Sequence, residues 1–267
     1  MQIKSQPIGV FDSGIGGLSV VKSLMEQLPN EDIIYFGDIA RIPYGTKSVA
    51  TIKKFTEQTV KFLIKQQVKA IIIACNTISA VAKDTVLQLA GNIPVIDVIS
   101  AGVSAASTIS NSIGIIATPA TINSNAYPLA ISQINPTIDV YSQACALFVP
   151  MVEEGFINHP ALELVAREYL SSLLQHNIDS LILGCTHYPL MIQTIAKVIG
   201  NQITIIDPAI TACAQLKSIL TSNDSINDRI THGVYKFYVT DVAVKFQNIG
   251  EMFLNQPMNH LEIVSVE

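Results

Sequence analysis

Short apolar segments alternate with longer amphipathic segments along this chain. The apolar run Ile8–Phe11 leads into a glycine-rich stretch at 12–17, after which apolar residues recur at helical spacing at Leu18, Val21, Leu24 and Leu28. Further apolar runs predict strands at 32–36, 70–74 and 95–98, with a helix over about 48–66. Alternation of this kind is typical of a parallel sheet covered by helices on both faces, so we expect an α/β fold.

The same pattern begins again near residue 99. The segment Ile113–Ile116 matches Ile8–Phe11 at an offset of 105 residues, and a strand beginning at 139 matches the strand beginning at 32 at an offset of 107. A third pair of strands ends in Cys75 and Cys185, which are 110 residues apart. Three matches in the same order predict an internal duplication, and therefore two pseudo-symmetric lobes.

The last part of the chain has no counterpart in the second half. It contains a predicted strand at Gly233–Val239, then a helix opening at Thr240-Asp241 and a final strand at Leu261–Val266. One face of that helix collects Val242, Phe246, Ile249 and Phe253. We expect this tail to pack on the first lobe, which would then comprise residues 1–98 plus 208–267, while the second lobe comprises 99–207.

Composition narrows the class of protein further. Of the 267 residues, 49% are hydrophobic and only 14% are charged, which fits elements buried on several sides. The formal net charge is −5 and no basic run is present, which argues against nucleic acid or an anionic membrane surface as a partner. The apolar runs are far shorter than the roughly 20 residues that span a bilayer.

The cysteines indicate a reducing compartment. There are four of them, at 75, 145, 185 and 213, without the close pairs of a disulfide framework. The first residues carry one lysine before Pro7 and no apolar stretch ending in a cleavage site, so a secretory signal is not expected. We therefore expect a cytoplasmic protein with reduced thiols.

Two of these cysteines occupy equivalent places in the repeat. Cys75 and Cys185 each end a buried strand and are each followed by small polar groups. Ligands of parallel α/β sheets bind beyond the carboxyl ends of the strands. If the lobes face each other, one thiol lies on each wall of a cleft. Two opposed thiols can take a proton from one face of a carbon and return it to the other.

Thiols suit this exchange because their ordinary pKa of about 8.5 makes both protonation states accessible near neutral pH. One thiolate and one thiol are needed at once, so each needs a partner. We expect His187 to serve Cys185, and Asp12 to serve Cys75. Because each sulfur should approach the carbon to about 3.5 Å, the sulfurs should lie roughly 7 Å apart, too far for a disulfide.

The glycine-rich stretch Asp12–Gly17 predicts how a substrate would be held. A strand–turn–helix junction with three glycines exposes backbone N–H groups, which bind anions. Ser19 stands where a dinucleotide fingerprint has its third glycine, so a carboxylate fits better than a nucleotide. Tyr44-Gly45 after Pro43 predicts a tight turn over the cleft. Further small donors lie beside the thiols, at Asn76, Thr77, Thr118, Thr121 and Thr186. The ligand implied is small and anionic, with an amine that Asp12 could hold.

Several segments together resemble the motif set of bacterial glutamate racemases, cofactor-independent members of the aspartate/glutamate racemase superfamily. They are Phe11–Leu18, Pro43–Gly45, Cys75–Thr77, Pro150–Glu153 and Gly184–Pro189. The resemblance spans nearly the whole chain. It implies two Rossmann-like parallel-sheet lobes with the active site in the cleft between them, no cofactor and no metal, and usually a homodimer.

The resemblance also implies an activity and residue roles. The activity is interconversion of L- and D-glutamate, which supplies D-glutamate for peptidoglycan. Cys75 would deprotonate D-glutamate and Cys185 L-glutamate, with Asp12 and Glu153 as supporting acid–base groups. The implied substrate contacts are Ser13, Tyr44, Gly45, Asn76, Thr77, Thr186 and His187.

Other interpretations remain open at this point. Cys145 and Cys213 fit simple burial, and Glu153 could be a surface carboxylate at a helix start. A metal site of Cys75, Cys185, His187 and Asp12 is disfavoured because no C-x-x-C pair is present. Other functions to weigh are a related racemase acting on aspartate, a cysteine hydrolase using Cys185 with His187, and a non-catalytic module that binds a small anion.

Overall fold

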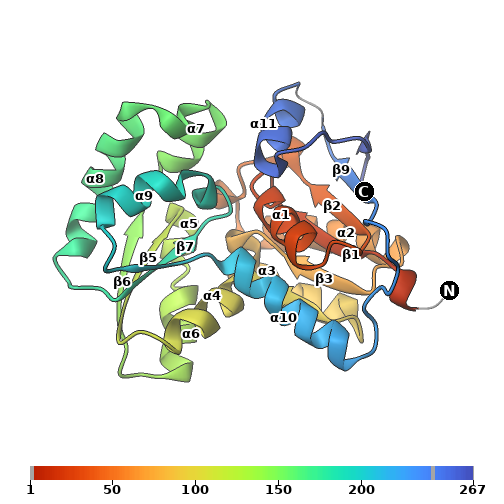
Figure 1. Ribbon diagram of the computed structural model, residues 1–267, viewed down its shortest axis with the longest axis horizontal. Coiled ribbons are helices and arrows are strands. Elements are labelled where there is room, and N and C mark those ends of the chain that lie inside the picture. Colours follow the sequence, from red (N-terminus) through yellow and green to blue (C-terminus); the bar gives the residue numbers. More distant parts are fainter. Residues whose placement is uncertain (1–2, 242–243, 267) are drawn as a thin grey trace. The chain divides into compact units, whose positions relative to one another are not determined.

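A computed structural model describes residues 3–241 and 244–266 of the chain (Figure 1). The chain divides into two compact units, one formed by Met1–Val98 with Ala209–Glu267 and the other by Ile99–Pro208. The first is called unit 1 and the second unit 2. No helix in the described part of the chain has the length and apolar character to cross a membrane.

Unit 1 is built on a six-stranded sheet in the order β10-β9-β2-β1-β3-β4, and the paired strands run parallel. The strands are β1 (Ile8–Asp12), β2 (Ile33–Gly37), β3 (Ala70–Ile73), β4 (Val95–Asp97), β9 (Tyr235–Val239) and β10 (Leu261–Ile263). All residues of β1, β2 and β3 are buried. Burial on both faces explains why these strands read as continuous apolar runs.

Helices cover both faces of this sheet. They are α1 (Leu18–Gln27), α2 (Val49–Lys65), α3 (Asn76–Ala90), α10 (Pro208–Ser222) and α11 (Val244–Leu254), with short 3-10 turns η1 (Ile3–Ser5), η2 (Ile39–Arg41) and η3 (Tyr44–Thr46). α2 and α3 pack side by side over one core, while α1 packs against α11 (Figure 1). The N-terminus of α2 is capped by Ser48, whose hydroxyl accepts from the Thr51 N–H at 3.2 Å.

Unit 2 repeats the central topology on a smaller scale. Its parallel strands are β5 (Ser112–Ala117), β6 (Asp139–Ala144), β7 (Ser180–Gly184) and β8 (Thr204–Ile206), in the order β6-β5-β7-β8. Its helices are α4 (Val98–Ser107), α5 (Pro119–Asn123), α6 (Ala126–Ile134), α7 (Phe148–Glu153), α8 (Pro160–Leu174) and α9 (Ile192–Ile199), with turns η4 (Phe156–Asn158) and η5 (Tyr188–Met191). This order corresponds strand for strand to β2-β1-β3-β4 of unit 1.

The predicted fold class is confirmed, since both sheets are parallel and covered by helices. Element ends differ from the predicted ones. β10 stops at Ile263 rather than Val266, because Ile263 pairs with Val239, where its neighbour β9 ends. The tail helix is described from Val244, and Val242 lies outside the described residues.

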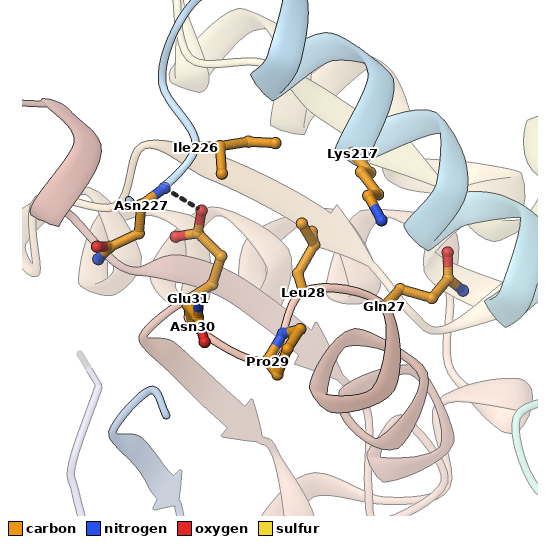
Figure 2. Close-up of a pocket in the computed structure, with 8 residues that line it drawn as sticks. All are labelled: Gln27, Leu28, Pro29, Asn30, Glu31, Lys217, Ile226 and Asn227. Carbon is orange, nitrogen blue, oxygen red and sulfur yellow. Dashed lines mark hydrogen bonds between the residues drawn. The ribbon is translucent and has the colours of Figure 1, made fainter. Parts of the chain in front are cut away.

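The returning tail adds β9 beside β2, so segments about 200 residues apart share one sheet (Figure 1). At the amino end of these strands a buried ion pair holds the tail. The Lys69 ammonium lies 2.6 Å from Glu31 and also donates to the Ser225 carbonyl at 2.7 Å. The other Glu31 oxygen accepts from the Asn227 N–H at 2.8 Å (Figure 2).

Candidate active site

Asp12 ends β1, and Cys75 follows the neighbouring strand β3 by two residues. Phe11 pairs with Ile73 across these strands, and the Ala74 N–H donates to the Phe11 carbonyl at 3.0 Å. Parallel register therefore brings the carboxyl ends of both strands, and the residues just beyond them, to one edge of the unit 1 sheet.

The loop after β1 folds around the Asp12 carboxylate. Asp12 is only 3% exposed, and one of its oxygens accepts hydrogen bonds from the N–H groups of Gly14 and Gly17, both at 3.1 Å. Sequence reasoning assigned the N–H groups of this loop to a bound anion. Two of them serve the loop's own carboxylate instead, which fixes Asp12 at the edge of the sheet.

The Cys75 thiol lies against the same loop. Its sulfur is 3.3 Å from the Ser13 hydroxyl oxygen and its residue is 6% exposed. Burial, and then the charge of Asp12, raise the pKa of Cys75 to about 12, while the Ser13 hydroxyl and nearby N–H groups act in the opposite direction. Cys75 is therefore a neutral thiol at neutral pH.

The other candidates of unit 1 gather at the same sheet edge. Asn76 and Thr77 are buried in the first turn of α3, directly after Cys75. Pro43, Tyr44 and Gly45 follow β2 and η2, with a cis peptide bond before Pro43. Pro43 and Gly45 are exposed, while Tyr44 is buried.

In unit 2, three side chains form a chain of contacts. Cys185 follows β7, and its sulfur lies 3.8 Å from Nδ1 of His187. Nε2 of the same ring lies 3.1 Å from a carboxylate oxygen of Glu153. Glu153 is the last residue of α7, so the suggestion that it stands at a helix start is wrong.

This arrangement sets the charge of His187. Burial alone would lower its pKa, but hydrogen bonds to Cys185 and Glu153, and the charges of both groups, raise it to about 10. His187 is therefore an imidazolium at neutral pH. This positive charge lies next to the Cys185 sulfur.

The three threonines predicted to bind substrate in unit 2 lie at or just after the carboxyl ends of β5 and β7. Ala117 pairs with Gly184, so Thr118 and Cys185 follow adjacent strands. The hydroxyl oxygens of Thr118 and Thr121 are 3.2 Å apart at the start of α5, and Thr186 is buried beside Cys185.

The remaining cysteines are packed in the cores. Cys145 and Cys213 are fully buried, and their sulfurs lie 3.7 Å and 3.6 Å from the carbonyls of Gln143 and Val20. All four cysteines are free thiols. Within the described residues, no group of three His, Cys, Asp or Glu side chains is arranged to hold a metal ion.

Two pockets open at the opposite edges of the sheets. One, of about 160 Å³, is lined by residues that include Leu28, Glu31 and Lys217 (Figure 2). The other, of about 500 Å³, is lined by residues that include Asp179 and Gly200. Both lie near the amino ends of the strands, away from the strand ends that carry the thiols.

Sequence reasoning missed three side chains that organise the unit 1 edge. Tyr35 donates from its hydroxyl to the Gly14 carbonyl at 2.6 Å. Arg41 and Thr240 both bind Asp38. Thr240 was assigned to a helix start, although a polar residue directly after a parallel strand signals the functional edge as well.

Comparisons with known proteins bear on this site. A family model described as Asp/Glu/Hydantoin racemase matches residues 8–216. The chain is 51% identical over 265 residues to a glutamate racemase of Neisseria meningitidis serogroup A, covering 98% of each chain. It is 49% identical to a glutamate racemase of Syntrophus aciditrophicus, covering 97% of each. A crystal structure of glutamate racemase from Francisella tularensis in complex with D-glutamate superposes with a TM-score of 0.93 at 61% identity, covering 98% of each chain.

Proposed function

Because this chain belongs to the Asp/Glu/Hydantoin racemase family and is an amino-acid racemase, an isomerase, we propose that it interconverts L- and D-glutamate without a cofactor. The relatives from Neisseria meningitidis and Syntrophus aciditrophicus are named glutamate racemase and are 51% and 49% identical to this chain over nearly its full length, which supports glutamate as the substrate.

One observation carries the proposed mechanism. Cys75 and Cys185 follow β3 and β7, which occupy the same place in two sheets of corresponding strand order. Each thiol also has its own polar partner, Ser13 in unit 1 and His187 in unit 2. A binding module has no use for two such thiols, whereas a racemase that uses two bases needs both.

In the proposed reaction, the Cys185 thiolate removes the α-proton of L-glutamate, and the electron pair of the C–H bond stays on the α-carbon. The Cys75 thiol then donates its proton to the opposite face, which gives D-glutamate. Cys185 ends as a thiol and Cys75 as a thiolate, so the protein is set for the reverse reaction. The mechanism requires the two sulfurs on opposite faces of one carbon.

The charges beside the thiols support this assignment of enantiomers. We assign Cys185 as the base because its sulfur lies next to the His187 imidazolium, while Cys75, with its pKa of about 12, starts as a thiol. This is the protonation state that accepts L-glutamate first. Asp12 and Glu153 support the two proton transfers through their charges.

We assign the remaining candidates to substrate binding. Their shared features are a place at the strand carboxyl edges and a small or polar side chain. They are Ser13, Pro43, Tyr44, Gly45, Asn76, Thr77, Thr118, Thr121, Thr186 and His187. Asp12 is placed in the same group as the partner of the substrate amine.

Racemisation in heavy water tests this function. Pure protein is incubated with L-glutamate and no added cofactor, and circular dichroism and α-deuteration are followed together. The optical signal should disappear while the D-glutamate formed carries solvent deuterium at its α-carbon. Cys75→Ala and Cys185→Ala should each abolish both signals and keep the far-ultraviolet spectrum of the fold. Cys213→Ala, which removes a buried thiol of the core, is the matched control.

The same assay separates the alternatives. Faster loss of optical signal with L-aspartate than with L-glutamate would identify an aspartate racemase. A cysteine hydrolase or an anion-binding module leaves both signals unchanged. Normal turnover by either cysteine variant contradicts the assigned roles.

In the cell, we assign this activity to the supply of D-glutamate for peptidoglycan, in the cytoplasm and as a homodimer. Reducing conditions suit the chemistry, because a proton can be exchanged only by thiols that are not oxidised.

A further inference from the structure

The Asp38 carboxylate is the centre of a buried cluster beneath the loop Ile42–Thr46. Asp38 follows β2 and is 1% exposed. It accepts hydrogen bonds from the Tyr44 hydroxyl, from Nε of Arg41 at 2.8 Å, and from the Thr240 hydroxyl at 2.9 Å. Two donors come from the segment that follows β2 and the third comes from the returning tail, so this one carboxylate joins the two segments.

Arg41 fixes the cluster to helix α2. Its guanidinium lies 4.1 Å from the centre of the Phe55 ring, and it donates to the Gln58 side chain at 2.6 Å. The ring of Tyr44 also packs on Phe55, with 5.8 Å between ring centres. The loop that carries Tyr44 and Gly45 is therefore packed against α2.

Strand register brings Thr240 to the cluster. β9 runs parallel to β2 with Val239 opposite Gly37, so the next residues, Thr240 and Asp38, lie side by side. The Thr240 hydroxyl donates to Asp38 and accepts from the Ala40 N–H, both at 2.9 Å. Both hydrogen-bonding capacities of this hydroxyl are thus directed at the segment that leads into the loop.

We propose that Thr240 is a positioning residue for substrate binding, acting through Asp38 on the loop that carries Tyr44 and Gly45. The inference rests on the proposed function, in which this loop contacts glutamate. Without the hydroxyl, the buried Asp38 carboxylate and the Ala40 N–H each lose a partner, and the segment from Ala40 to Gly45 loses this link to the tail.

This role explains a difference between the two units. In unit 2 the strand equivalent to β2 is β6, which lies at the edge of its sheet. In unit 1 the returning tail places β9 next to β2, and β9 delivers Thr240 to the carboxyl edge. The tail therefore supplies a polar group to the candidate site as well as apolar residues to the core.

The test compares Thr240→Val, which keeps the branched shape and removes the hydroxyl, with Thr240→Ser, which keeps the hydroxyl. Thr240→Val should raise KM for glutamate about five- to tenfold with little change in kcat, the size expected for the loss of one ordinary intramolecular hydrogen bond. It should also speed amide hydrogen exchange in the segment 39–47 of the free protein. Thr240→Ser should stay close to wild type in both measurements.

The matched control is Thr221→Val in α10 of the same tail, where the hydroxyl donates to the Lys217 carbonyl at 2.7 Å. It should leave KM and exchange in 39–47 unchanged. A double-mutant cycle adds Tyr44→Phe. If Thr240 acts through Asp38 on Tyr44, the effect of Thr240→Val on KM should shrink at least threefold in the Tyr44→Phe background.

Each outcome has a distinct meaning. Wild-type KM and wild-type exchange in Thr240→Val overturn the proposal, and so does an equal defect in Thr240→Ser, which would point to lost packing. Full additivity with Tyr44→Phe overturns the route through Asp38. Absence of glutamate turnover in the wild-type protein defeats the proposed function, while the exchange measurement still reports whether Thr240 holds the loop.

Discussion

At the scale of single residues, the two candidate thiols differ in the charge that surrounds them. Burial and the Asp12 carboxylate raise the pKa of Cys75 and keep it protonated, while Cys185 faces an imidazolium. A reaction that starts with one base and one acid needs this inequality. The Glu153–His187 contact maintains it, because it keeps the positive charge on the ring.

Replacing Glu153 tests this contact. In the folded protein the pKa of His187 lies near 10, above its ordinary value of about 6.5, so the ring stays charged until the pH rises through about 10. The contribution of this charge to the stability of the folded protein is complete below pH 6.5, and it is lost as the pH rises through about 10. Glu153→Gln removes one cause of the raised pKa. The alkaline limb of the kcat profile should therefore move to lower pH by about one unit.

The control for this profile is Glu154→Gln, which removes the same charge one residue further along at an exposed position. Its alkaline limb should coincide with that of the wild type. An unmoved limb in Glu153→Gln would show that His187 does not carry the relevant charge. The two enantiomers have equal free energies, so any loss of kcat/KM must be the same in both directions, which checks the data internally.

Sequence reasoning worked at residue scale where chemistry follows from chain position. A cysteine, a threonine or an aspartate directly after a buried strand could be placed at the sheet edge without coordinates. Their catalytic roles stay predictions. The partners could not be foreseen in the same way, since Thr240 meets Asp38 only through the pairing of strands about 200 residues apart.

At the scale of elements, the β1–α1 junction is tightly packed at one of its glycines and open at another. A Cβ atom at Gly17 would lie 2.5 Å from the Cβ of Asp12 and 3.1 Å from that of Ala74. At Gly14 the nearest atom is a methyl of Ile42, at an ordinary 3.6 Å. The loop therefore has room for a small side chain at Gly14 but not at Gly17.

This difference predicts unequal effects of the same substitution. Gly17→Ala should force β1 and the loop apart, with a loss of about 1–3 kcal/mol in the free energy of unfolding and a large loss of activity, because Asp12 moves. Gly14→Ala has room for its methyl group and keeps the N–H that donates to Asp12, so its loss in the free energy of unfolding should be much smaller. Urea unfolding and glutamate turnover measure both. Equal losses in the two variants would contradict the steric argument.

Elements with a long or regular apolar pattern were predictable, and the shortest ones were not. The strands of both sheets follow from runs such as Ile71–Ile73, which are apolar and bounded by turn residues. Helix α7 has six residues and contains Pro150, too short for a periodic pattern to emerge. Its position matters, because it carries Glu153 to His187.

At the scale of the whole molecule, the chain leaves unit 1, forms unit 2 and returns. The returning segment completes the sheet of unit 1 at β9 and β10. Its attachment at the amino edge depends on Lys69, whose ammonium meets Glu31 and the carbonyls of Lys4 and Ser225. One side chain thus joins the first turn, a central strand and the tail.

Breaking this buried ion pair should destabilise unit 1 more than removing a charged side chain at the surface. Lys69 and Glu31 are 0% and 1% exposed, so Lys69→Met leaves an uncompensated carboxylate in the interior, which costs about 3–5 kcal/mol in the free energy of unfolding. The double variant Lys69→Met/Glu31→Gln removes that charge and should recover part of the loss. Lys4→Met is the control, since its ammonium pairs with Asp224 at the surface, and should unfold close to wild type. Urea unfolding followed by circular dichroism measures all four proteins. If the double variant is no more stable than Lys69→Met, the uncompensated carboxylate is not the main cause of the loss. The hydrogen bonds from the Lys69 ammonium to its two carbonyl partners would then be what holds the tail.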